Sequence, residues 1–254
     1  MKRVTIIVTH LLGSGHLSRS LILARALRDA GMEAQLISGG MPAPHLATSG
    51  IDFVQLPPVR SDGAGFTRLL DSKGEPVSPE FMKQRAEAMT TVVRRTPPDL
   101  LITELFPFGR RMLRGEFLAT LSAAQQLDRP PLIFSSIRDI LAPPSTPAKA
   151  EQTEAWLDQY YDGVLVHSDA AVLPLEVSWP VTEATAQLLH YTGFIAAPPP
   201  PSRPAGHEGD GEILVTAGGG PVGRKLFETA VRAARPGGPR WRLLVGGSDA
   251  AAFS

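Results

Sequence analysis

The sequence predicts a doubly wound α/β fold, in which helices cover both faces of a parallel β-sheet. Three observations support this prediction. Short apolar segments rich in β-branched residues alternate along the chain with longer segments of helical periodicity. The apolar segments lack alternating polar residues, which is typical of strands buried on both faces of a parallel sheet. Glycine and proline occur 24 times each in 254 residues, which indicates many tight connections between elements.

The composition excludes several classes of protein. The chain carries 25 basic and 25 acidic residues, so it lacks the overall basic field with which proteins bind nucleic acid. It has no cysteine, which excludes disulfides and thiolate metal sites. Hydrophobic residues make up 43% and charged residues 20%, as in a globular protein with a sizeable core. These values favour an enzyme scaffold and no nucleic-acid partner.

The N-terminal segment MKRVTIIVTHLL places two basic residues before an apolar run, as signal peptides do. The run is too short for a secretory signal and leads directly into His10 and a glycine loop. We therefore interpret residues 4–9 as the first strand. No apolar stretch reaches the roughly 18 residues of a membrane-spanning helix, and we expect a cytoplasmic protein.

The first helix is predicted over residues 17–30, after the loop GSGH. Leu17, Leu21, Ala24 and Leu27 fall on one face of such a helix, and Gly31 supplies its end. Short apolar segments bounded by glycine or proline then predict strands at 34–38 and 53–56.

The remaining elements of the first unit continue the alternation. A loop rich in Gly, Asp and Ser covers residues 60–79, and Pro97 and Pro98 end the helix that follows it. Helices are predicted at 80–95, 110–127 and 151–161, and strands at 100–103, 132–135, 163–166 and 191–195. Together these segments predict one α/β domain over residues 1–195.

A proline-rich segment divides the chain. Residues 196–211, AAPPPPSRPAGHEGDG, have the composition of an interdomain linker. In residues 212–254 the alternation of strands and helices begins again, with a strand at 213–216, the loop AGGGPVG, a helix at 224–234 and a strand at 241–245. A single βαβ unit cannot bury a domain core, so we expect a chain truncated within a second α/β domain or ended by a premature stop.

Gly13 and Gly15 lie between the first strand and its helix, where small residues let backbone N–H groups approach an anionic ligand. The alternative is a tight turn without a ligand. A dinucleotide fingerprint would need a third glycine at Ser18 and an acidic residue after the second strand, which instead ends in Ser38 and Gly39. NAD binding is therefore disfavoured.

His16 follows the glycine loop at the carboxyl edge of the predicted sheet, where open α/β folds bind ligands. It could act as a general base or donate a hydrogen bond to phosphate. Arg19, one turn further along the helix, favours this functional interpretation. The alternative is a histidine that caps the helix or packs in the core.

Further polar residues follow other strands at the same edge. Glu104 comes after the fourth strand, and Arg138 and Asp139 come after the fifth. A carboxylate and a guanidinium placed there could orient a hydroxyl and a phosphate. Mutual salt bridges or solvated loop charges are equally compatible with the sequence. A weaker candidate group follows the sixth strand: His167, Ser168 and Asp169.

Two more segments are candidates for ligand contact. The segment FPFG precedes a basic group, Arg110, Arg111 and Arg114, which could touch a phospholipid or a polyprenyl-phosphate acceptor. A solvated helix face is the more common outcome for such charges. In the second unit the glycine loop is denser than a plain turn requires, and we interpret it as facing a diphosphate; its glycines are Gly218, Gly219, Gly220 and Gly223.

Several of these motifs resemble those of GT-B-fold glycosyltransferases. GSGHLSR after the first strand, the proline-bearing linker and ILVTAGGGPVG are similar to family 28 and to the peptidoglycan-precursor N-acetylglucosaminyltransferase. TELFPFGRR, SSIRDIL and LVHSD running on to VLPLE resemble a bacterial group of predicted glycosyltransferases more closely. The resemblance covers essentially the whole chain. It implies a Rossmann-like, acceptor-side domain and the start of a second, donor-binding one.

The resemblance also implies an activity. A sugar would pass from a nucleotide-diphosphate sugar to a sugar, lipid-linked or small-molecule acceptor, with no metal, no cofactor and no covalent intermediate. Gly13, Gly15 and His16 would face the cleft, and the segment 218–220 would lie near the donor diphosphate. His16, or failing it Glu104, would take the acceptor proton. A lipid-linked acceptor would bring peripheral contact with the inner face of the plasma membrane.

This chain departs from the family pattern because it lacks most of a C-terminal domain, so we expect it to bind donor poorly and to turn over little. Two alternatives stay open. Relatives of the fold hydrolyse nucleotide sugars with a histidine in an equivalent GxGH loop. A remnant N-terminal domain could also bind a partner without catalysis.

Overall fold

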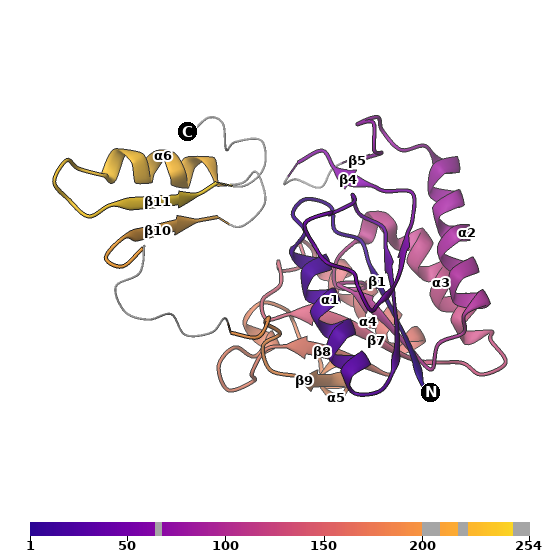
Figure 1. The fold of residues 1–254 in the computed structure, drawn as a ribbon. Coiled ribbons are helices and arrows are strands. Elements are labelled where there is room, and N and C mark those ends of the chain that lie inside the picture. Colours follow the sequence, from indigo (N-terminus) through magenta and orange to yellow (C-terminus); the bar gives the residue numbers. More distant parts are fainter. Residues whose placement is uncertain (64–67, 200–208, 218–222, 246–254) are drawn as a thin grey trace.

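The computed structural model describes residues 1–63, 68–199, 209–217 and 223–245 (Figure 1). Its main element is a seven-stranded sheet in the order β3-β2-β1-β6-β7-β8-β9, and all neighbouring strands in it are parallel. The strands are β1 (Arg3–Val8), β2 (Glu33–Ser38), β3 (Asp52–Gln55), β6 (Leu100–Glu104), β7 (Leu132–Arg138), β8 (Gly163–His167) and β9 (Leu189–Tyr191).

The order of the strands confirms the doubly wound fold predicted from the sequence. The chain builds outward from β1 to β3, returns to place β6 beside β1, and then builds outward in the other direction. The connections that follow β1 and β6 therefore diverge from one point at the carboxyl edge of the sheet, which is where such folds bind ligands.

Helices lie on both faces of this sheet (Figure 1). They are α1 (Gly15–Asp29), α2 (Pro79–Arg95), α3 (Arg114–Gln125), α4 (Pro147–Tyr160) and α5 (Glu183–Leu188), with single 3₁₀ turns η1 (Arg111–Leu113) and η2 (Leu175–Val177). In β1, Ile6 packs into the core beneath α1, whereas Ile7 packs into a second core with α2, α3 and α4. This double burial explains why the strand is apolar at successive positions.

A buried ion pair joins α2 to α3. The Arg85 guanidinium donates two hydrogen bonds of 2.9 Å to the Glu116 carboxylate, and neither side chain is exposed to solvent. The same guanidinium donates to the carbonyl oxygens of Gly39 and Pro57. The pair thus holds the segments after β2 and β3, and it sets the shape of the loops beside the carboxyl edge.

Several elements differ from the sequence prediction. Helix α4 begins at Pro147 and not at 151, and the short helix α5 was not predicted. Helix α3 begins at Arg114 and not at 110, because Arg110 has a left-handed backbone (φ 59°) that cannot start a helix. The strand predicted at 191–195 is β9, at 189–191, and the positive φ of Gly193 (74°) turns the chain after it. Strand β7 runs to Arg138, three residues beyond the predicted end at 135.

The segment predicted as an irregular loop at 60–79 contains a small antiparallel hairpin, β4 (Arg60–Ser61) and β5 (Leu69–Leu70). Each of its strands has two residues, which is too short to produce a periodic pattern in the sequence.

The second unit has the predicted βαβ order. Strand β10 (Ile213–Thr216) pairs in parallel with β11 (Trp241–Leu244), and α6 (Arg224–Ala233) connects them. Phe227 and Ala230 are the buried residues of α6. The division of the chain into domains at 1–195, 196–211 and 212–254 stays a prediction from the sequence.

Candidate functional site

The candidate site lies at the carboxyl edge of the sheet, beside the point where β1 and β6 are neighbours. A pocket of about 430 Å³ opens there. The residues that line it include Gly13, Gly15, His16, Arg19, Arg110 and Arg138. All of these except Arg110 were predicted as site residues from the sequence, so the fold brings together residues from three separate connections.

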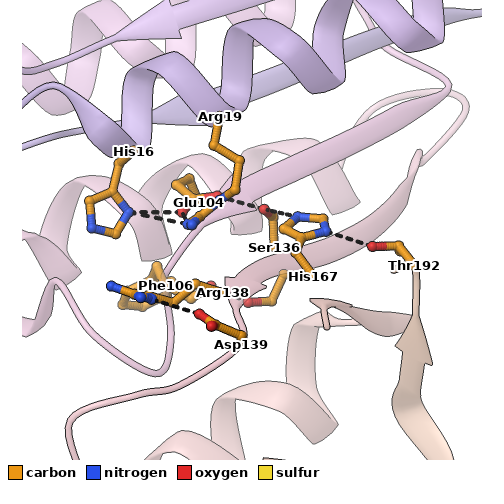
Figure 2. Close-up of polar contacts among 10 residues, drawn as sticks. His16, Arg19, Glu104, Phe106, Ser136, Arg138, Asp139, His167 and Thr192 are labelled. Atoms are coloured by element: carbon orange, nitrogen blue, oxygen red, sulfur yellow. Dashed lines mark hydrogen bonds and ion pairs between the residues drawn. The ribbon is translucent and has the colours of Figure 1, made fainter. Parts of the chain in front are cut away.

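His16 and Glu104 form the centre of the site. The Nδ1 atom of His16, in the first turn of α1, lies 2.9 Å from Oε1 of Glu104, the last residue of β6 (Figure 2). The Arg19 guanidinium donates a hydrogen bond to the same oxygen. The carboxylate is 2% exposed, so one buried charge holds two side chains of the same helix.

The electrostatics of this contact define its protonation. Burial alone would raise the pKa of Glu104, but the hydrogen bond from His16 and the charge of Arg19 lower it below its usual range. Burial lowers the pKa of His16, and Glu104 offsets part of that effect. At neutral pH the carboxylate is ionised and the imidazole is neutral. His16 Nδ1 then carries the proton and donates a hydrogen bond to Glu104, which leaves Nε2 with a free lone pair.

A chain of hydrogen bonds continues from Glu104 across the sheet edge (Figure 2). The Ser136 hydroxyl lies 2.5 Å from Glu104 Oε2 and 2.9 Å from Nε2 of His167. Because an ionised carboxylate only accepts, the serine proton points to Glu104 and His167 Nε2–H donates to the serine oxygen.

The far end of the chain agrees with this direction. His167 Nδ1 lies 2.8 Å from the Thr192 hydroxyl and accepts a hydrogen bond from it. Burial lowers the pKa of His167 to about 4, so its ring is neutral and has one N–H, as the chain requires. The sequence had marked His167 only as a weak candidate.

The two residues after His167 do not take part in this chain of hydrogen bonds. The Ser168 hydroxyl donates to the Leu173 carbonyl, and Asp169 accepts from the Ala171 N–H.

Arg138 and Asp139 behave differently from each other. Arg138 is half exposed and lines the pocket, whereas Asp139 is held by a 3.0 Å hydrogen bond from the Arg138 Nε. The salt-bridge alternative raised from the sequence therefore holds for this pair. Arg138 nevertheless remains within the pocket and presents its positive charge there.

Arg110 is a pocket residue that the sequence suggested only as part of a possible lipid-contacting group, and not as part of the sugar-transfer site. It follows Gly109 in the segment after β6, six positions beyond Glu104. Its backbone is left-handed, so Arg110 is not part of α3. Burial lowers its pKa to about 10, and the charge of Glu104 opposes that shift. Its place just after a strand at the carboxyl edge was a usable signal, but the neighbouring arginines suggested a helix face.

The other parts of the predicted basic and aromatic patch do not share one surface. Phe106 and Phe108 are buried in the core, where Phe106 stacks on Phe117 with ring centroids 4.7 Å apart. Arg111 donates to the Thr153 hydroxyl at 2.7 Å, outside the pocket. Arg114 is exposed at the start of α3. The segment therefore presents no aromatic side chains for a lipid surface.

The predicted diphosphate loop, Gly218, Gly219 and Gly220, lies outside the described residues. Gly223, which is described, precedes α6 and packs closely against Phe227. Within the described ranges no group of three or more His, Asp or Glu side chains is arranged to hold a metal ion. The same part of the chain contains no helix that is long and apolar enough to cross a membrane.

Comparison with known proteins relates this fold to solved structures. No family model matches the chain, and no curated protein does. The calicheamicin glycosyltransferase CalG4 superposes with a TM-score of 0.55 at 16% identity, over 99% of this chain and 68% of that one. MurG of Acinetobacter baumannii superposes with a TM-score of 0.50 at 14% identity, over 100% of this chain and 71% of that one. TarM superposes with a TM-score of 0.57 at 9% identity, over 100% of this chain and 73% of that one. The chain thus has a GT-B glycosyltransferase-like fold.

Proposed function

We propose that this protein transfers a sugar from a nucleotide-diphosphate sugar to a hydroxyl group of an acceptor, with His16 as the general base. The observation that carries the proposal is the pairing of His16 with the buried carboxylate of Glu104 beside the pocket. The fold, which is that of glycosyltransferases of known structure, supports the choice of reaction.

The reaction follows from the protonation of the pair. His16 Nε2 accepts the proton of the acceptor hydroxyl, while the oxygen of that hydroxyl forms a bond to the anomeric carbon of the donor. The bond from that carbon to the donor diphosphate breaks, and the nucleoside diphosphate leaves with the electron pair. Glu104 stabilises the imidazolium that forms and keeps its ring in one orientation. The chemistry assigned to these residues involves no metal ion and no covalent intermediate.

We assign proton uptake to His16 and not to Glu104. Both carboxylate oxygens of Glu104 already accept hydrogen bonds, from His16 and Arg19 on one side and from Ser136 on the other. Gly13, Gly15, Arg19 and Arg138 contribute to substrate binding in this proposal, and Gly218 to Gly220 contact the donor diphosphate.

The proposal is tested by His16→Ala in the longest form of the protein that its gene encodes. We expect turnover with a panel of nucleotide sugars and acceptors to fall by about 10² to 10⁴. Donor affinity measured by calorimetry should change little, because a general base acts chiefly in the transition state. Unchanged turnover would remove His16 from the mechanism.

Product analysis separates transfer from hydrolysis. A hydrolase would release free sugar and nucleoside diphosphate at a rate that does not depend on added acceptor. A transferase forms the glycosylated acceptor, and its rate rises with acceptor concentration. Mass spectrometry of the reaction mixture distinguishes the two.

A further inference from the structure

The pocket contains more positive than negative charge. Three guanidinium groups, those of Arg19, Arg110 and Arg138, line it. The Arg19 guanidinium is paired with Glu104, and that of Arg138 with Asp139. The Arg110 guanidinium makes no hydrogen bond or ion pair with any residue that the structure describes. One guanidinium of the pocket therefore makes no direct ion pair within the described part of the protein, and the charge of Glu104 acts on it without a hydrogen bond.

The backbone holds Arg110 at this place. Its φ of 59° is rare for a residue with a side chain and commonly persists where the surroundings enforce it. Phe106 and Phe108, just before it, anchor the segment in the core. Burial disfavours the charged form of Arg110, yet with a pKa of about 10 it stays charged at neutral pH. A desolvated cation of this kind is stabilised by an anion.

The first turn of α1 adds to the same field. The Ser14 hydroxyl does not cap the helix but contacts Nε2 of His45 at 3.0 Å, and no acidic residue occupies the first turn. A side chain added at Gly15 would meet no atom within 4 Å. The N–H groups at the start of this helix thus have no side-chain cap, and the positive end of the helix dipole adds to the charge of the arginines.

We propose that this pocket binds a phosphate-type oxyanion carried by the acceptor, with Arg110 as the residue that recognises it and Arg138 as a second cation. The inference rests on the proposed function, since it concerns the acceptor of that reaction. Arginine presents a planar fork of N–H groups that fits phosphate oxygens. The pocket volume of about 430 Å³ leaves room for a further group of the ligand beside a phosphate.

The position of His16 favours the acceptor as the source of the oxyanion. In the proposed reaction the acceptor hydroxyl lies at His16 Nε2, and His16 and Arg110 line the same pocket. The donor diphosphate offers the same chemistry, so the test must separate the two sources.

The test is a titration of inorganic phosphate into the protein at constant ionic strength, followed through the NMR signals of the His16 imidazole. Arg110→Gln should weaken saturable phosphate binding at least about tenfold, because it removes a charge-assisted contact. Arg114→Gln is the matched control, since Arg114 is exposed and does not line the pocket. The phosphate affinity of Arg114→Gln should stay within about twofold of the parent's, because solvent and salt largely screen the effect of an exposed charge.

Arg110→Lys is the second variant, because it keeps the charge and removes the fork; it should bind phosphate with an affinity between those of Arg110→Gln and the parent. Circular dichroism confirms that each variant is folded. If the parent protein shows no saturable phosphate binding, or if Arg110→Gln binds as tightly as the parent, the inference is wrong.

Uridine diphosphate serves as the probe for the second source. Phosphate that stays bound at saturating uridine diphosphate supports an acceptor site. Competitive displacement that depends on Arg110 would assign the pocket to the donor and overturn the acceptor assignment. Failure to find sugar transfer, with Arg110-dependent phosphate binding intact, would refute the proposed reaction and leave the oxyanion site standing.

Discussion

At the scale of single residues, the two nitrogen atoms of the His16 imidazole have different roles: one holds the ring in place, and the other is proposed to act as the base. Nδ1 is committed to the ionised Glu104, and Nε2 is the atom left to act as a base. This division depends on Glu104 remaining charged although it is 2% exposed. The hydrogen bond from Ser136 is one of the contacts that stabilise this charge.

Ser136→Ala should raise the pKa of His16. Without the serine proton the Glu104 carboxylate loses a donor, becomes more basic and stabilises the protonated imidazole more strongly. Ser135→Ala is the matched control, because its hydroxyl donates to the Phe106 carbonyl and not to Glu104. NMR titration of the His16 ring measures the effect; equal pKa values in both variants would contradict the role given to Ser136.

His167 should make stability depend on pH. Its pKa is about 4 in the folded protein and about 6.5 in an unfolded chain. Between these values the unfolded state binds a proton that the folded state does not, so stability falls as pH decreases. We expect a loss of about 2 kcal/mol from this group between pH 7 and pH 5.

Urea denaturation of the parent and of His167→Asn at both pH values isolates this contribution. The variant should be less stable at pH 7, because it leaves part of the hydrogen-bond chain unpaired. Its further loss on acidification should be smaller than that of the parent by about 2 kcal/mol. The same pH dependence in both proteins would show that His167 does not titrate as proposed.

At the scale of elements, helices α2 and α3 are joined by the pair Arg85 and Glu116, which has no contact with solvent. The pair also fixes the segments that follow β2 and β3 through the carbonyl oxygens of Gly39 and Pro57. A periodic apolar pattern would fill these positions with hydrophobic residues. Here a charged pair ties four parts of the chain together.

Breaking this pair on one side should be costly. Arg85→Met leaves the Glu116 carboxylate buried without its partner, and we expect a loss of about 3 to 5 kcal/mol of folding free energy. Arg85→Met combined with Glu116→Leu should lose less than Arg85→Met alone, because no buried charge remains. Urea denaturation measures both. A double variant at least as unstable as Arg85→Met would contradict this explanation.

At the scale of the whole molecule, the described strands form separate sheets. The seven-stranded sheet has its own two cores, and β10 and β11 pair only with each other. The sequence places a proline-rich linker between these parts, at residues 196–211. We therefore expect residues 1–195 to fold without the second unit.

Limited proteolysis with an enzyme that cuts after Glu and Asp checks this prediction. The first cuts should fall within 196–211, where Glu208 and Asp210 are the acidic residues. The larger fragment should keep cooperative thermal unfolding with a midpoint within a few degrees of the intact chain, because its cores are untouched. Earlier cleavage in the segment 60–79, or loss of cooperative unfolding, would argue against an independent first unit.

The sequence by itself determined the fold class, most of the helices and strands, and the edge of the sheet at which polar residues gather. Those properties follow from local signals, namely apolar periodicity, glycine loops and the rule that parallel strands end at one edge. They were enough to select His16, Glu104 and Arg138 before their positions were known.

Only the tertiary structure decided which of these side chains touch. His16 and Glu104 are 88 positions apart, and Ser136 and His167 are 31 apart, so no local pattern reports their contact. Arg110 and Arg111 are neighbours in the sequence, yet one lines the pocket and the other bonds to Thr153. The direction of a side chain depends on the backbone angles and on packing with distant residues, whereas periodicity in the sequence reports burial alone.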